Sequence, residues 1–218
     1  MTNAAYIVID GMDGSGKGTV LDGLRAIYPP LDGDNSQRFI YTREPGGSPL
    51  AEQIRRLVVN DPMSALTELL LFVAAREDLR RVLIGPAVDR GQHVISDRSV
   101  SSTFSYQIHG RQQPDLLPTL RYLDKLHMVW PSLYVFLDLE PELAAKRTGG
   151  RAAEVGSEDG AKFDRESIDF HTRVREGFKT FPAFEPDVPC HFVDASQTPD
   201  AVLSEVSAII ATHLATFR

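Results

Sequence analysis

The amino-acid sequence predicts an α/β fold in which five parallel strands form one sheet with helices on both of its faces. Two observations lead to this prediction. Short apolar runs alternate along the chain with segments of helical periodicity. The runs are apolar at consecutive positions, which is typical of strands that helices cover on both sides, and the alternation itself is typical of a parallel sheet.

Each predicted strand is a short run rich in β-branched or aromatic residues. The five runs are Ala4–Asp10 (AAYIVID), Arg38–Thr42 (RFIYT), His93–Ser96 (HVIS), Leu133–Leu137 (LYVFL) and His191–Val193 (HFV). Turn-forming residues follow the first run directly, and the polar loop at residues 32–36 precedes the second. Helical segments separate each strand from the next.

The predicted helices are Lys17–Ile27, Leu50–Val59, Ala65–Leu83, Asp115–His127, Glu142–Lys146, Asp164–Phe178 and Pro199–Ala215. The breaker at residues 60–62 (NDP) separates the second helix from the third. Residues 148–161 (TGGRAAEVGSEDGA) are rich in glycine and small polar residues and have no periodicity. Because such a loop inside a compact domain is typically functional, residues 147–163 are predicted to form a small mobile lid.

Length and composition restrict the class of protein. The 218 residues suit one domain, residues 1–218, with a sizeable core. The net charge of −7 excludes broad binding to nucleic-acid polymers, which needs a cationic surface, but permits a small anionic ligand at a locally basic site. No apolar run approaches the roughly 20 residues that span a bilayer, so no membrane partner is expected. A single cysteine, Cys190, fits a reducing, cytoplasmic setting.

A glycine-rich loop follows the first strand and opens the first helix. Residues 11–17 (GMDGSGK) match G-x-x-x-x-G-K, in which backbone N–H groups cradle phosphates and the lysine reaches the β- and γ-phosphates. The strand–loop–helix context favours this interpretation over a hairpin turn and predicts a P-loop NTPase type of fold. Gly18 stands where the pattern usually has Ser or Thr for Mg²⁺, and a hydroxyl follows one residue late, at Thr19. We expect ATP to bind Gly11, Asp13, Gly14, Ser15, Gly16, Lys17, Gly18 and Thr19.

Four further segments lie at predicted strand ends or on adjacent helices, so they can converge on one crevice at the carboxyl edge of the sheet. They are residues 42–49 (TREPGGSP) with Arg55, residues 72–76 (FVAAR), residues 97–107 (DRSVSSTFSYQ), and the lid cations Arg147, Arg151 and Lys162. Phe72 and Arg76, four residues apart, would offer a ring face and donors to a flat base. Asp97 is placed to hold Mg²⁺ together with Thr19, and Arg98 to hold a second phosphate. Cations on a lid would neutralise charge on a transferring phosphoryl group.

Each segment also has a plain structural interpretation. On the helix alone, a core Phe72 and a solvated Arg76 are the better interpretation. Asp97 and the serines after it would also suit the N-terminus of a helix. The lid cations could also be charged residues exposed to solvent.

Taken together, the segments resemble the thymidylate (dTMP) kinases of the nucleoside monophosphate kinase family. The resemblance extends from Ile7 to about Phe178. It rests on the turn Thr42–Gly47 (TREPGG), the F-x-x-x-R helix of Phe72 and Arg76, and the string D-R-x-x-x-S-x-x-x-Y-Q at residues 97–107. It implies ATP-dependent phosphorylation of dTMP to dTDP in dTTP synthesis, with Mg²⁺, in a homodimer.

The resemblance implies residue roles on the base side of the acceptor site. Phe72 would stack on thymine, and Arg76 would donate to a base carbonyl. Thr103 and Gln107 would lie near the base edge. Tyr106 would pack by the sugar where a 2′-hydroxyl is excluded.

It also implies roles on the phosphate side. Asp13 would meet the 3′-hydroxyl or the 5′-phosphate region, and Arg55 and Arg98 would hold the acceptor phosphate. Glu44 and Pro45 would contribute from the turn. The implied catalytic residues are Lys17, Arg98, Arg147 and Arg151.

The sequence departs from the family pattern at Gly18, Ser48, Ser99 and Ser105. These departures leave the phosphate chemistry intact and bear on how strictly thymidine is selected. The alternatives are another deoxynucleotide or deoxynucleoside kinase, and a nucleotide-binding module without catalytic activity.

Overall fold

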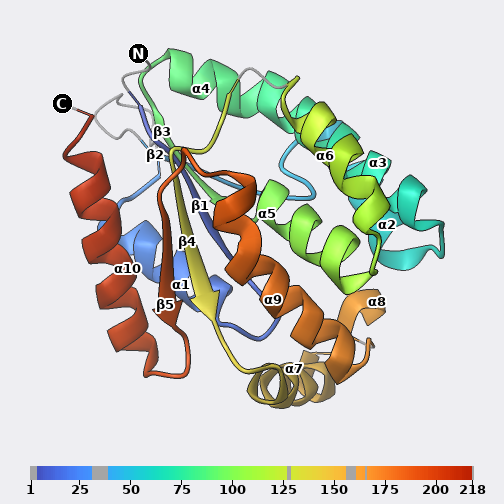
Figure 1. Cartoon of the computed structure of the whole chain (residues 1–218). Helices are drawn as coiled ribbons and strands as arrows, with labels where there is room; N and C mark the ends of the chain where they lie inside the picture. The colour runs from blue at the N-terminus through green and yellow to red at the C-terminus, as the bar shows by residue number, and fades with distance from the viewer. Residues whose placement is uncertain (1–3, 31–38, 127–128, 156–160, 165, 218) are drawn as a thin grey trace.

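Five parallel strands form the sheet in the computed structural model, which describes residues 4–30, 39–126, 129–155, 161–164 and 166–217, with the backbone alone at 150–155, 161 and 164. The strands are β1 (Tyr6–Gly11), β2 (Phe39–Arg43), β3 (His93–Asp97), β4 (Leu133–Asp138) and β5 (Cys190–Asp194). Their order across the sheet is β2-β3-β1-β4-β5, and every neighbouring pair is parallel (Figure 1). The predicted five-stranded parallel sheet is confirmed.

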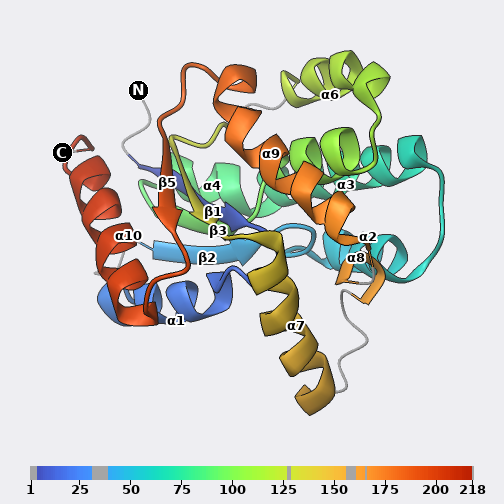
Figure 2. The ribbon, with the colours of Figure 1, turned by 60° about the horizontal axis from the view of Figure 1, so that its bottom comes forward.

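The central strand β1 explains why the apolar runs are continuous. All six of its residues are buried, and Ile7 pairs with Ile95 of β3 on one side and Leu133 of β4 on the other. Helices cover both faces: α1 and α10 lie on one side of the sheet, and α3 and α9 on the other (Figure 2). A strand in this position has no solvated face, so its sequence does not alternate between apolar and polar residues.

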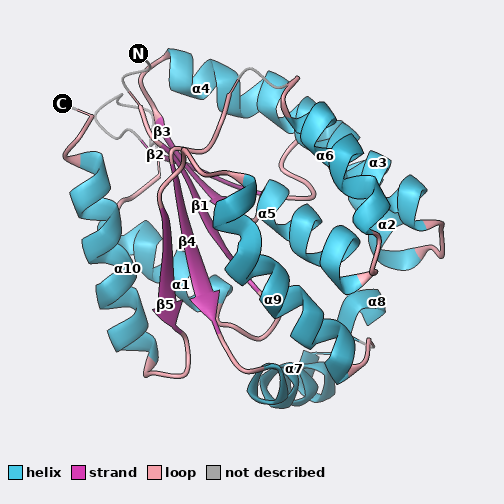
Figure 3. Ribbon diagram, viewed as in Figure 1, coloured by secondary structure: helices cyan, strands magenta, loops and turns pink. Residues whose placement is uncertain are grey.

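Helical segments surround the sheet (Figure 3). The α-helices are α1 (Lys17–Ile27), α2 (Pro49–Asn60), α3 (Ala65–Leu79), α4 (Gly85–Asp89), α5 (Val100–Thr103), α6 (Leu117–Asp124), α7 (Pro141–Val155), α8 (Ala161–Asp164), α9 (Ile168–Phe184) and α10 (Pro199–Leu214). Two π-helical segments, η1 (Arg80–Ile84) and η2 (Phe104–Gly110), and a 3-10 turn, η3 (Pro114–Leu116), connect some of them. Among the described residues, none of the helices has both the length and the apolar character needed to cross a bilayer.

Hydroxyl side chains fix where four of the helices begin. Ser48, Ser64, Ser167 and Thr198 each precede a helix and accept a hydrogen bond from the backbone N–H three residues later. This contact satisfies one of the N–H groups that have no partner within the helix, and it sets the first turn. The cap at Ser167 is why α9 begins at Ile168 and not at the predicted Asp164.

The helix predicted over Ala65–Leu83 is present, but it changes from an α-helix to a π-helix within this span. The α-helical ladder ends at Leu79, and the N–H of Gly85 donates to the carbonyl of Arg80, a π-type bond one residue longer than an α-helical one. Pro86 follows and has no N–H to continue the ladder. The helix predicted over Asp115–His127 likewise starts as a 3-10 turn and ends at Asp124, while His127 lies outside the described residues.

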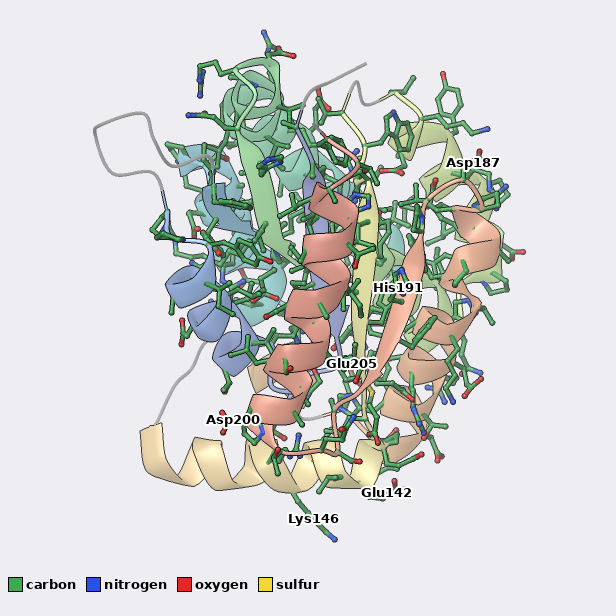
Figure 4. All side chains as sticks on the ribbon, turned by 90° about the vertical axis from the view of Figure 1, so that its left-hand side faces the viewer. Glu142, Lys146, Asp187, His191, Asp200 and Glu205 are labelled. Atoms are coloured by element: carbon green, nitrogen blue, oxygen red, sulfur yellow. The ribbon has the colours of Figure 1, made fainter. Side chains whose placement is uncertain are left out.

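The segment expected to be a loop without periodicity is partly helical. Helix α7 continues from Pro141 to Val155, so residues 148–155 extend the helix predicted to end at Lys146. The Thr148 hydroxyl donates to the carbonyl of Ala144 across this point. Glycines at 149 and 150 disfavour a helix, but the arginine, alanines and glutamate after them are acceptable helix formers. Helix α7 projects from the body of the molecule, with Lys146 on its outer side (Figures 2 and 4).

Candidate active site

The phosphate loop lies between the end of β1 and the start of α1, next to the first turn of α7. Gly14 has φ +83°, and a β-carbon there would lie 2.5 Å from the carbonyl oxygen of Ala144 on α7. Glycine is therefore required for the turn and for the close approach of α7. The first N–H groups of α1 have no intrahelical partners, which makes this helix end suited to phosphate oxygens.

Lys17 is held inside the loop. Its side chain is buried, and its Nζ donates to the carbonyls of Gly11 (3.0 Å) and Met12 (2.9 Å) and lies 4.0 Å from the Asp13 carboxylate. Burial, with the nearby Arg98 cation, lowers the pKa of Lys17. A bound phosphate would add negative charge beside this ammonium and so favour its protonated form.

Arg98 connects the phosphate loop to the helix after β3. Its backbone has φ +72°, a left-handed conformation that is costly for a residue with a side chain and is often found at functional sites. This turn lets the guanidinium donate to the Gly11 carbonyl (3.2 Å), Ser102 Oγ (2.8 Å) and Asp13 Oδ1 (2.5 Å). Arg98 therefore lies directly beside the phosphate loop, as its predicted role requires.

Asp13 and Tyr106 extend the same network. The Tyr106 hydroxyl donates to Asp13 Oδ2 at 3.1 Å, and the Arg98 guanidinium lies 5.3 Å from the centre of the Tyr106 ring. Burial by itself would raise the pKa of Asp13, but Arg98 and Lys17 together hold it well below its usual range. Burial and the Asp13 charge raise the pKa of Tyr106, so its phenol remains a donor. The structure thus brings together a P-loop residue and a residue of the D-R string, as predicted.

Asp10 is a site residue that the sequence analysis missed. It is fully buried at the end of β1 and accepts hydrogen bonds from Ser101 Oγ (2.6 Å), Ser102 Oγ (2.8 Å) and the Gly11 N–H (2.8 Å). It also lies 3.4 Å from Arg98. Burial raises its pKa, against the effect of Arg98. A carboxylate within an otherwise apolar strand was the available signal, because a buried charge needs dedicated partners.

The turn after β2 holds one half of a buried ion pair. Glu44 Oε2 accepts from Arg76 Nε at 2.7 Å, and Arg76 Nη2 donates to Thr103 Oγ1 at 2.7 Å. Arg76 is only 2% exposed, so the solvated arginine considered for the helix alone is wrong. Its Nη1 is buried with no hydrogen-bond partner among the described residues. A donor of this kind suits a carbonyl oxygen supplied by a ligand.

The remaining acceptor-side residues lie on neighbouring elements. Phe72 is half-buried on α3, one helical turn before Arg76. Arg55 on α2 donates to the carbonyl of Pro45 at 3.1 Å, which ties that helix to the turn. Gln107 on η2 is buried, and its Nε2 donates to Glu68 at 3.0 Å.

Of the predicted lid cations, the two whose side chains are described, Arg147 and Lys162, contact different parts of the molecule. Arg147 on α7 donates to the carbonyl of Ala195 after β5, at 3.1 Å. Lys162 on α8 instead donates to Glu68 at 2.7 Å and to the carbonyls of Val58 and Asp61. The side chain of Arg151 lies outside the described residues, although its backbone belongs to α7.

Asp97, which the sequence analysis predicts to hold Mg²⁺, ends β3. Its Oδ1 is buried without a hydrogen-bond partner in the described part of the chain, at the end of β3 next to Arg98. Thr19 lies exposed on the first turn of α1. No group of three or more His, Cys, Asp or Glu residues among those described is arranged to hold a metal. One carboxylate nevertheless fits Mg²⁺, which in nucleotide sites takes most of its ligands from phosphates and water.

The burial of Tyr6 beside Glu44 can be tested by the pH dependence of stability. Its hydroxyl lies 3.4 Å from Glu44 Oε1, and burial, followed by the Glu44 charge, raises the pKa of Tyr6 to about 12. Because this value exceeds the ordinary 10.0, the protonated phenol contributes stability that is complete below pH 10.0 and is lost as the pH rises through about 12. Across that interval, we expect the free energy of unfolding to fall about 3 kcal/mol further in the native protein than in Tyr6→Phe.

Denaturant unfolding at several pH values between about 8 and 12 measures this difference. The other tyrosines are common to both proteins and cancel in the comparison. Parallel losses in the two proteins would contradict the assignment.

The sheet order and the phosphate loop after β1 define the P-loop NTPase class of fold, and Arg98 lies beside that loop as a cation suited to a phosphate group. The sequence matches the thymidylate kinase family over residues 9–206. It is 36% identical over 215 residues to the thymidylate kinase of Nitratidesulfovibrio vulgaris strain DP4, covering 96% of this chain and 93% of the relative. The chain belongs to the thymidylate kinase family, the enzymes that phosphorylate dTMP to dTDP.

Two further similarities agree with this membership. The thymidylate kinase of Jannaschia sp. strain CCS1 is 38% identical over 222 residues, covering 96% of this chain and 97% of the relative. The crystal structure of thymidylate kinase from Ehrlichia chaffeensis matches with a TM-score of 0.70 at 28% identity, covering 95% of this chain and 98% of that one.

Proposed function

We propose that this chain transfers the γ-phosphoryl group of ATP to the 5′-phosphate of dTMP with the residues predicted above. An oxygen of the dTMP phosphate attacks the γ-phosphorus, the bond to the β-phosphate oxygen breaks, and ADP leaves. The attacking oxygen is already anionic, so the protein needs no strong general base. Positioning and charge neutralisation supply the catalysis.

The donor side of this reaction rests on the phosphate loop. The N–H groups of residues 11–19 would bind the ATP phosphates, and Lys17 would move its ammonium from the loop carbonyls to the phosphate oxygens. Arg147 and Arg151 would act from the lid on the transferring group. In this structure Arg147 donates to the carbonyl of Ala195, so this role requires its guanidinium to leave that contact.

The position of Arg98 is the observation that carries the proposal. Its guanidinium lies between the phosphate loop and the helix with the acceptor string, within 3.2 Å of both the Gly11 carbonyl and Ser102. A cation between the donor and acceptor segments can neutralise both phosphates as they approach. Arg55, on α2, would hold the other side of the acceptor phosphate.

The base side of the acceptor site supports thymine as the base. Phe72 offers a ring face, and the unpartnered Nη1 of Arg76 would donate to a base carbonyl. Thr103 holds the guanidinium in place, Gln107 would lie near the base edge, and the Tyr106–Asp13 pair would line the sugar. These six side chains come from α3, the P-loop, α5 and η2.

The acceptor specificity is tested by measuring ADP release with dTMP, dUMP, AMP and thymidine. We expect the highest kcat/KM with dTMP. Thymidine should give no measurable turnover, because it has no phosphate for Arg55 and Arg98 and no anionic nucleophile. Equal turnover of thymidine would indicate a nucleoside kinase. Binding of ATP and dTMP without ADP release would indicate an inactive module.

Mg²⁺, when bound, would neutralise negative charge on the ATP phosphates. We propose Asp97 as its protein partner, with Thr19 near it. A β-carbon at Gly18 would meet nothing within 4 Å, so a serine is accommodated there.

Gly18→Ser tests the metal site. This variant restores the hydroxyl of the common P-loop pattern, so we expect the Mg²⁺ concentration for half-maximal activity to fall severalfold. Thr19→Ala should raise it. Unchanged Mg²⁺ dependence in both variants would argue against a metal role for this turn.

We also propose a homodimer and a cytoplasmic location. Leu50 and Leu57 on α2 and Leu66 and Leu70 on α3 are each 45–49% exposed, and adjacent apolar side chains of this size are typical of an interface. Sedimentation of the native protein against Leu66→Glu/Leu70→Glu tests the dimer.

The single cysteine, half-buried with a pKa raised to about 12, suits a reducing compartment.

A further inference from the structure

Glu68 is a buried carboxylate outside the residues assigned above. It lies in the first turn of α3 and is 2% exposed. Its Oε2 accepts from Lys162 Nζ at 2.7 Å, and its Oε1 accepts from Gln107 Nε2 at 3.0 Å and Arg111 Nε at 3.3 Å. A buried charge without such partners would be strongly destabilising, so the three donors and the carboxylate form one unit.

The three donors come from elements that are far apart in the sequence. Lys162 belongs to α8 and also donates to the carbonyls of Val58 and Asp61 at the end of α2. Arg111 follows η2 and forms a second ion pair with Glu166, just before α9. Glu68 thus connects α8 to α2, α3 and η2.

This unit also determines what lies against the acceptor residues. Phe163, next to Lys162 on α8, is buried, and its ring centre lies 6.5 Å from that of Phe72 and 5.6 Å from that of Tyr106. The Arg111 guanidinium lies 5.5 Å from the same ring. A short helix of four residues has little stability of its own, so these contacts depend on what anchors it.

The Glu68 charge also orients the amide of Gln107. An acceptor-only carboxylate draws the NH₂ group toward itself, which leaves the amide oxygen of Gln107 as the acceptor for other groups. Burial would raise the pKa of Glu68, but donation from Lys162 and Gln107 and the charge of Arg111 hold it below its ordinary value. The carboxylate is therefore ionised at neutral pH.

We propose that Glu68 is a positioning residue that couples the lid to the dTMP pocket: it anchors α8 through Lys162 and so keeps Phe163 against Phe72 and Tyr106. The proposal rests on the proposed assignment of Phe72, Tyr106 and Gln107 to the acceptor site. Without the anchor, α8 would leave these residues part of the time, and dTMP binding would have to restore the contact. The apparent Kd for dTMP then equals the intrinsic Kd divided by the fraction of molecules in which α8 is anchored.

The test compares Glu68→Gln with the native enzyme in steady-state kinetics. We expect the KM for dTMP to rise about tenfold, while kcat at saturating dTMP and the KM for ATP change less than about twofold. Glu68→Asp keeps the charge and should restore part of the affinity. Glu176→Gln is the matched control, since it removes the carboxylate of an exposed pair with Lys179 on α9 and should change nothing.

Lys162→Met provides a second route to the same contact if Glu68→Gln folds poorly. Because both changes break one interaction, their effects on the KM for dTMP should be non-additive in the double variant. Hydrogen exchange of the amides at residues 161–166 should be faster in either variant without dTMP and return to the native rate when dTMP is added.

Three outcomes would overturn the proposal: an unchanged KM for dTMP, equal increases in the KM of dTMP and ATP, or additive effects in the double variant. If the proposed acceptor is wrong, the native enzyme will turn over another acceptor with a higher kcat/KM than dTMP. This is measured before any variant is made, so the two failures are distinguishable.

Discussion

Arg98→Ala is expected to lose about a hundredfold to a thousandfold in kcat/KM for dTMP, because the guanidinium neutralises charge between the two phosphates. The side chain makes three donor contacts that span the phosphate loop and the acceptor helix, at 2.5 to 3.2 Å. Steady-state kinetics with varied dTMP at saturating ATP measure the effect. Arg98→Lys should recover only part of it, since an ammonium cannot hold this planar fork of contacts.

The matched control for Arg98 is Arg25→Ala. Arg25 forms an exposed ion pair with Asp22 on α1 and lies outside the site, so its removal should leave kcat/KM unchanged. Thermal unfolding must show that Arg98→Ala is folded, because Asp10 and Asp13 lose a cation in this variant. Near-native kcat/KM in the folded variant would exclude the proposed role.

Arg76→Met is expected to lower the free energy of unfolding by about 3–5 kcal/mol, because it leaves the Glu44 carboxylate buried and unpaired. It should also raise the KM for dTMP roughly tenfold to a hundredfold through loss of a charged donor to the base. Denaturant unfolding and steady-state kinetics measure the two effects separately.

The double variant Arg76→Met/Glu44→Gln separates stability from binding. It removes both charges of the buried pair, so most of the stability should return. The KM for dTMP should stay high, because no guanidinium is present to meet the base. Recovery of both properties would show that Arg76 serves the fold alone.

The phosphate loop and the sheet could be predicted from the sequence for a physical reason: their signals are local. A continuous apolar run such as residues 4–10 is favoured only in a strand buried on both faces, and G-x-x-x-x-G-K depends on conformations within seven residues. The D-R string was also local enough to place Arg98 beside the loop, although its left-handed backbone was not foreseen.

The lid was less predictable because helix formation there depends on context. Glycines at 149 and 150 suggested a loop, yet α7 continues through them to Val155. A weak propensity of about 1 kcal/mol per glycine is readily outweighed by flanking helix formers and by packing. The cations assigned to the lid also have partners that sequence spacing does not encode, as the contacts of Arg147 with Ala195 and of Lys162 with Glu68 show.

The sequence by itself predicted the strands, the phosphate loop and, through several short motifs that resemble a known family, the class of acceptor, because each strand, loop and motif is formed by residues close together in the chain. Only the tertiary structure decided which charges are buried and with what partner. From its position on a helix alone, the Arg76 side chain could be either exposed to solvent or buried. The fold buries it by bringing Glu44 and Thr103, 32 and 27 residues away in sequence, within hydrogen-bond distance. Asp10 and Glu68 acquire their importance in the same way: a carboxylate becomes a structural centre only where folding excludes water and supplies its donors.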